Sequence, residues 1–178
     1  MRQAPAVLAA ALVAAAAIAG GAGAAIGEGS ATGTGFVDVT SPEFGHVAFS
    51  VTVAAHGGPA AATGRLIFRF GGVQYRARVD CILVVPNPIE HGVPATGTGA
   101  LVHAVLDEPS ETPFGTVTAI GGEVVDNGEG AHSPPDAVIF GFELFPPPPG
   151  FGACTPTFVD FGDAFPVEHG NFVVRSTP

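Results

Sequence analysis

The sequence predicts a single all-β domain, an antiparallel β-barrel of about eight short strands, with a β-sandwich as the alternative. Apolar and polar residues alternate along several short segments, and Gly or Pro clusters separate these segments at fairly regular spacing. No segment shows sustained helical periodicity, and 26 Gly and 17 Pro leave little room for a long helix. We prefer the barrel because closure leaves no unpaired strand edge.

The clearest element is a hairpin spanning Leu66 to Val85, with Gly71-Gly72 as a two-residue turn. Counting outward from this turn pairs apolar residues on one face, namely Phe70 with Val73, Phe68 with Tyr75 and Leu66 with Ala77. The other face carries arginines, so a one-residue slip would bury charge, and the pattern specifies the register. The same alternation continues along the second strand and predicts that Cys81 points into the core.

Residues 1–24 are typical of a secretory signal peptide. A charged Met1-Arg2 head precedes an apolar run, and Ala22-Gly23-Ala24 supplies the small residues of a cleavage site. A retained membrane anchor is the alternative, but the run is short for the ~20 residues that a membrane-spanning helix needs. We therefore expect a secreted or extracytoplasmic protein with no stable membrane anchor after cleavage. Residues 25–35 are expected to be a flexible leader, and residues 36–178 a single β-domain.

Cleavage would remove Arg2 and leave 5 Arg, no Lys and 16 acidic residues, a net charge of 5 − 16 = −11. This balance argues against nucleic acid and anionic membranes as partners, because both repel an acidic protein. A protein, a glycan or a small apolar ligand is the partner class that remains.

Further strands are predicted on both sides of the hairpin. They cover residues 36–39, 44–54, 98–107, 115–126, 137–145, 157–161 and 171–175. An acidic loop, residues 107–113, is expected between the strands at 98–107 and 115–126. Residues 146–149 should run as polyproline II.

Cys81 and Cys154 are the only cysteines. Export would favour their oxidation to a disulfide, and a loop of this length would make the bridge worth roughly 4 kcal/mol in the chain-entropy model. A redox pair or a metal site is the alternative, but the spacing is not C-x-x-C and no His adjoins either thiol. We expect a structural bridge.

A polar block follows the strand that ends at Asp126. Its carboxylate and amide oxygens are hard ligands, so a calcium site is one interpretation; the candidate ligands are Asp126, Asn127, Glu129 and Asp136. The spacing does not match an EF-hand, and Asp-Asn-Gly is first of all a turn sequence. We expect the turn, with calcium as the alternative and no other cofactor.

Four short motifs occur in order along the chain, namely Val79-Asp80-Cys81, Val125-Asp126-Asn127-Gly128-Glu129, Pro135-Asp136 before an apolar strand, and Gly170-Asn171-Phe172-Val173-Val174 after Cys154. In this order they resemble a family of small secreted bacterial proteins, mainly actinobacterial and largely uncharacterised. The resemblance covers about residues 44 to 175. The longer Pro86 to Gly97 loop departs from the family pattern, which has a tight turn there. The resemblance implies a secreted β-domain and supplies no catalytic residue.

The arginines of the hairpin are a candidate binding patch. Four of the five arginines left after cleavage lie on one face of it, namely Arg65, Arg69, Arg76 and Arg78. Such a patch would receive an anion or a partner's carboxylates, whereas pairing with the chain's own acids is the alternative. The 14 Phe are expected to fill a core, with a ligand cavity as the alternative.

No pattern of catalytic residues stands out. The six histidines, His46, His56, His91, His103, His132 and His169, form no metal-binding or helical pair, and we expect each to be solvated. There is no G-x-S-x-G motif and no phosphate-binding loop. We therefore expect a secreted, non-enzymatic β-domain with a binding or structural role at or outside the cell surface. A barrel that carries a small apolar ligand is the first alternative, and a hydrolase is the second.

Overall fold

The computed structural model describes residues 27–41, 45–86, 97–112, 115–129, 132–143 and 164–177. They form nine strands, namely β1 (Gly29–Ser41), β2 (Gly45–Gly57), β3 (Ala62–Phe70), β4 (Val73–Pro86), β5 (Thr98–Thr112), β6 (Gly115–Asp126), β7 (Ala137–Glu143), β8 (Phe165–Pro166) and β9 (His169–Ser176). All pair antiparallel in one sheet, in the order β8-β7-β6-β5-β4-β3-β2-β1-β9. Among the described residues there is no helix that could cross a membrane.

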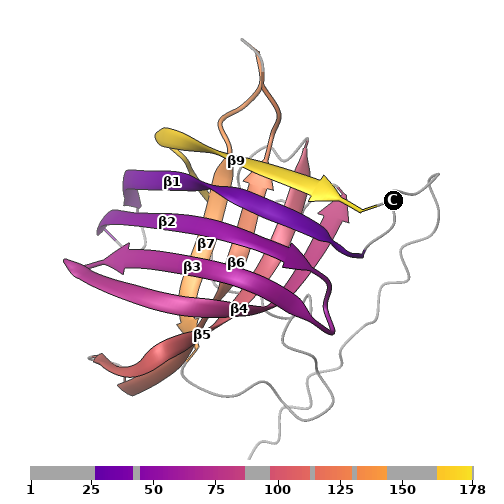
Figure 1. The fold of residues 1–178 in the computed structure, drawn as a ribbon. Helices are drawn as coiled ribbons and strands as arrows, with labels where there is room; N and C mark the ends of the chain where they lie inside the picture. The colour runs from indigo at the N-terminus through magenta and orange to yellow at the C-terminus, as the bar shows by residue number, and fades with distance from the viewer. Residues whose placement is uncertain are drawn as a thin grey trace, which may run out of the picture.

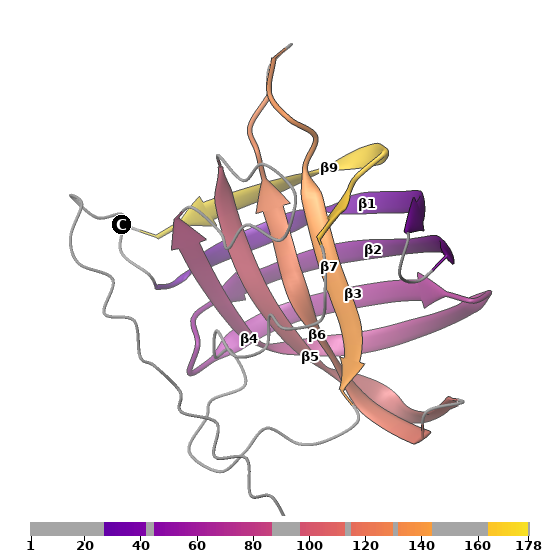
Figure 2. The ribbon, with the colours of Figure 1, turned by 180° about the vertical axis from the view of Figure 1, so that it is seen from behind.

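The sheet curls so strongly that its two halves face each other. Strands β5 to β7 cross behind β1 to β3, and β4 starts beside β3 and ends among the strands of the other half (Figure 1; Figure 2). The strand changes direction at a β-bulge, where Asp80 has no partner on β5. The core lies on the inner face of the curl, where apolar residues from both halves pack together.

The predicted register of the central hairpin is confirmed. Phe70 pairs with Val73, and the pairing continues to Arg65 opposite Arg78. Gly71 and Gly72 have φ values of 59° and 81°, which glycine adopts at little steric cost. The turn chemistry and the alternation of side chains therefore agree on one register.

The prediction that Cys81 points into the main core is wrong. The bulge at Asp80 inserts one residue, so the alternation of β4 reverses beyond it. Ile82 and Val84 then enter the main core, whereas Cys81 and Leu83 form a separate buried cluster with Leu101 on the outer face.

The predicted barrel is only partly confirmed, because the described strands form an open, strongly curled sheet. β8 and β9 are the two ends of the strand order and do not pair with each other. Backbone hydrogen bonds bridge the ends locally, from Val167 N–H to the carbonyl of Asp136 and from Glu168 N–H to that of Phe36. The side chains of Asp126 and Asp136 add to this closure.

Residues 29–35, expected to belong to a flexible leader, instead form the first half of β1, between β2 and β9. A Cβ added at Gly35 would lie 2.7 Å from the ring of Phe172, and one at Gly33 only 2.9 Å from it. Phe172 itself is fully buried. Gly35 is therefore required by the aromatic ring that covers the strand, whereas Gly33 has a φ of 149° and also lies against the backbone oxygen of Asn171. Neither glycine marks a linker.

The remaining strand predictions divide in the same way. The segments predicted near residues 36–39, 44–54, 98–107, 115–126 and 171–175 are strands, and most of them extend further than predicted. Residues 107–112, expected to be a loop, continue β5 beyond an irregularity. The predicted strand at 157–161 and the polyproline segment at 146–149 lie outside the described residues.

The aromatic side chains gather at one end of the interior. Phe68 lies at the centre, and its ring centroid is 5.6 Å from the ring centroids of both Phe49 and Phe142. The rings of Tyr75 and Phe142 pack edge to face, with their centroids 4.8 Å apart. These separations are those of packed rings. The packing favours the expectation that these phenylalanines fill a core over the alternative that they line a ligand cavity.

Candidate functional site: a groove beside the central hairpin

Phe70 and Val73 flank the turn between β3 and β4 and are the large apolar side chains that stand out as exposed in the described structure. Their exposed fractions are 42% and 49%. Phe70 also touches the rings of Phe68 and Phe142, so it continues the aromatic core outward to the surface. An apolar cluster that reaches the surface at a rigid turn is typical of a contact site.

Next to this turn, β5 separates from β4. The pairing between them ends at Ala77 and Leu106, and residues 106–109 stand opposite the single residue Thr118 of β6. Pro109 lies in this irregular stretch and has no N–H to donate to a ladder. Beyond it, the ends of β5 and β6 form an arm that projects past β4 (Figure 1).

The separation leaves an open groove with a volume of about 400 Å³. One wall is the start of β4, residues 73–76, and the other is residues 106–110 of β5. Val73, Tyr75 and Leu106 make the groove apolar on the inner side, while Gln74 and Arg76 are exposed on the outer side. We call this feature the hairpin groove.

The backbone of β4 is not paired along the groove. In a two-residue hairpin the residues that flank the turn exchange hydrogen bonds, so Val73 and Tyr75 direct their backbone groups to β3. The N–H and C=O groups of Gln74 and Arg76 therefore point the other way, toward the groove. In the described part of the chain neither residue has a partner in the β4–β5 ladder, although Arg76 adjoins its last pair, Ala77 with Leu106. The groove thus combines an apolar wall with a short free sheet edge.

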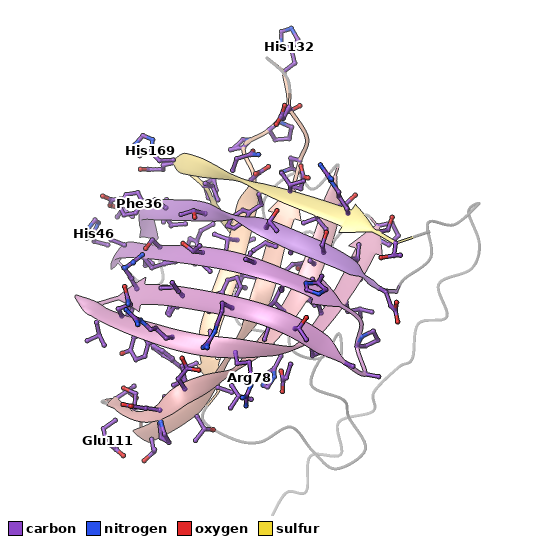
Figure 3. The ribbon with its side chains drawn as sticks, in the orientation of Figure 1. Phe36, His46, Arg78, Glu111, His132 and His169 are labelled. Carbon is purple, nitrogen blue, oxygen red and sulfur yellow. The ribbon has the colours of Figure 1, made fainter. Side chains whose placement is uncertain are left out.

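The four arginines predicted to share a face do so, and the groove opens beside them. Arg65 donates to both carboxylate oxygens of Asp107, at 2.8 and 2.7 Å, and Arg69 Nε donates to Gln74 at 2.9 Å. Arg76 and Arg78 are exposed and make no ion pair with the described residues. Figure 3 shows Arg78 projecting from β4 near the arm that carries Glu111. We call these four residues the arginine face.

The polar block at Asp126 to Asp136 joins β6 and β7 to β9. Asp126 accepts the backbone N–H groups of Gly128 and Val174, at 2.8 and 3.0 Å. Asp136 accepts those of Asn127 and Phe172, at 3.0 and 2.6 Å. The carboxylates therefore hold the exposed edge of β9 against the other end of the sheet.

Burial raises the pKa of Asp136; the nearby carboxylate of Asp126 adds to this, and its two backbone donors oppose it. Glu129, also considered as a calcium ligand, is exposed and has no part in this arrangement. Within the described ranges no group of three metal-ligating side chains converges. The geometry thus supports the turn interpretation, extended by a closure of the sheet that the sequence did not indicate.

A second polar group is buried on the outer face. His103 is 6% exposed and its Nδ1 lies 2.5 Å from the carboxylate of Asp80, the bulge residue. Glu123 of the neighbouring β6 is 2% exposed, and its Oε1 has no hydrogen-bond partner in the described structure. Burial raises the pKa of Glu123 from 4.5 to about 7.

This buried polar group was not predicted from the sequence. The expectation that every histidine is solvated is wrong for His103, because the bulge brings Asp80 to it and burial follows. His46, His132 and His169 lie at the periphery, as expected (Figure 3), and His91 lies outside the described residues. A buried histidine is not placed to meet a substrate, so the pair does not by itself indicate catalysis.

Cys81 is buried and is not a free thiol. Its expected partner, Cys154, lies outside the described residues, so the disulfide between them stays a prediction.

Comparisons of the chain with protein-family models, with curated proteins and with solved structures gave no match. The resemblance to the secreted bacterial family therefore stays an expectation, and function must be argued from the geometry alone.

Proposed function

We propose that this chain is an exported β-domain that binds an extended partner through the hairpin groove, and that it is not an enzyme. The observation that carries the proposal is the position of the groove. Its lining includes Val73, one of the two exposed apolar side chains at the turn, and Arg76, an exposed cation of the arginine face. An apolar anchor with a charged rim is the usual anatomy of a protein contact.

Export is supported by the signal-like residues 1–24 and by the two cysteines. Intact mass spectrometry of the protein secreted by its natural host checks it. A chain that begins near Ala25 and has lost two hydrogens is the expected result. A full-length, reduced chain retained in the cell contradicts export.

The binding role is tested by selecting random extended peptides on a display library against the mature, oxidised protein. We expect the recovered peptides to lose binding to the double variant Phe70→Ser and Val73→Ser. The matched control is His56→Ala, an exposed residue at the opposite end of β2 whose ring meets Thr63 at 3.0 Å. Peptides that bind both variants equally, or no enrichment at all, would overturn the proposal.

A further inference from the structure

The free edge of β4 suggests how the groove recognises its partner. We propose that the hairpin groove binds by strand addition, with an extended peptide pairing to the backbone of Gln74 and Arg76, and that the peptide alternates apolar and acidic residues. This inference rests on the proposed function and specifies the chemistry of the same site.

The register of the hairpin decides where the backbone groups of β4 point. Gln74 and Arg76 turn their N–H and C=O groups away from β3, and β5 leaves the sheet at Leu106 before it reaches them. The unpaired stretch, residues 73–76, is ~13 Å long, enough for about four residues of an added strand. A peptide laid there would take the place that β5 vacates, which is the geometry of β-augmentation.

The pleat of β4 decides which side chains of an added strand enter the groove. Residues of an added strand point to the same faces as their neighbours on β4. Ligand side chains beside Val73 and Tyr75 would enter the apolar wall of the groove, which also includes Leu106. Those beside Gln74 and Arg76 would lie on the outer face, next to the arginine face.

Charge complementarity selects acidic residues for these outer positions. The arginine face has four cations, of which Arg76 lines the groove, and two carboxylates also line the groove. Asp107 is one of these carboxylates and is already engaged by Arg65. Glu108 is the other and is exposed. Arg76 and Arg78 are therefore the cations best placed to meet a ligand carboxylate.

A second copy of this chain fits the edge less well. Pairing two β4 edges would bring two arginine faces together on one side of the joined sheet, and like charges on neighbouring strands repel. An acidic peptide would instead place carboxylates beside these arginines, where opposite charges attract.

The test uses the mature, oxidised protein and a synthetic peptide of about seven residues, long enough to pass the gap, in which Val and Glu alternate. Binding is measured by titration calorimetry. Four comparison peptides are needed. One has the same composition with the alternation destroyed, one has Lys in place of Glu, and two have N-methyl groups on the backbone amides along one edge or the other. A methylated pair, one for each edge, covers both orientations of the peptide.

We expect the alternating peptide to bind and each altered peptide to bind at least about tenfold more weakly, with one member of the methylated pair affected more than the other. Arg76→Glu should weaken binding by a similar factor. Arg175→Glu is the matched control, because Arg175 is exposed on β9, several strands away from β4. It should change binding less than about twofold.

Equal binding of both methylated peptides would overturn strand addition. If library peptides still required Phe70 and Val73, the proposed function would stand and only this inference would fail. A dimer of the free protein that the Phe70→Ser and Val73→Ser double variant dissolves would overturn the inference in favour of a second copy.

Discussion

The carboxylate of Asp136 accepts the backbone N–H of Phe172 at 2.6 Å, although 36 residues separate the two in sequence. The bond joins the start of β7 to the edge of β9, where no ladder connects the strands. Asp126 makes the corresponding bond to Val174. Two acidic side chains thus extend the local closure that the backbone bonds of Val167 and Glu168 make between the ends of the open sheet.

Replacing Asp136 with Asn should destabilise the fold by about 2–4 kcal/mol. The amide keeps one acceptor but turns an N–H₂ group toward one of the two backbone donors, and hydrogen bonds to charged groups contribute about 1.5–3 kcal/mol each. Urea unfolding measures the difference. Glu129→Gln, in the same block but exposed, should change stability by no more than about 0.5 kcal/mol. Equal effects of the two variants would contradict the closure.

The contact of Gly35 with Phe172 should be visible as an energetic coupling. A Cβ at Gly35 would lie 2.7 and 2.8 Å from two ring atoms of Phe172, so Gly35→Ala should cost about 1–3 kcal/mol. In a Phe172→Leu background the same change should cost less, because the ring that it meets is gone. Thr32→Ala, at an exposed position of β1, serves as the control. Additive effects of the two changes would contradict the packing role of Gly35.

Glu123 should make the protein less stable as the pH rises. Its pKa is about 7 in the folded chain against 4.5 when unfolded, so the folded state retains a proton that the unfolded state has released. The contribution is fully present below pH 4.5 and is lost as the pH rises through about 7. The loss over this window is roughly 3 kcal/mol, from ~1.4 kcal/mol per pH unit.

Glu123→Gln should remove this pH dependence. Between pH 5 and pH 8 the free energy of unfolding of the variant, measured in urea, should therefore rise relative to that of the wild type. The exposed Glu108→Gln serves as the control and should follow the wild type. Parallel pH profiles for wild type and Glu123→Gln would contradict the assignment.

The sequence predicted features that depend on neighbouring residues and missed features that depend on distant strands. The β3–β4 register was predictable because Gly71-Gly72 and the alternation of side chains lie within one hairpin. The reversal at Asp80 was not, because a bulge depends on how β4 crosses between the two halves of the sheet. The strand at residues 29–35 was hidden because glycines that admit Phe172 look like a linker until the distant ring is placed.

The candidate site divides in the same way. The arginine face was predictable from alternation alone. The hairpin groove was not predictable, because it exists only where β5 separates from β4 at Leu106. Pro109 alone does not indicate that separation in the sequence. The burial of Glu123 and His103 likewise depends on how β4, β5 and β6 pack, with the bulge placing Asp80 beside His103.

The most direct test of the free edge is amide hydrogen exchange at single-residue resolution, measured by NMR. In the free protein the amides of Gln74 and Arg76 should exchange fast, whereas those of Tyr75 and Ala77, which face β3, should be protected. Saturation with the alternating Val-Glu peptide should slow Gln74 and Arg76 by about tenfold or more and leave Tyr75 little changed. Protection of Gln74 and Arg76 already in the free protein, or exchange that the bound peptide does not slow, would contradict the account.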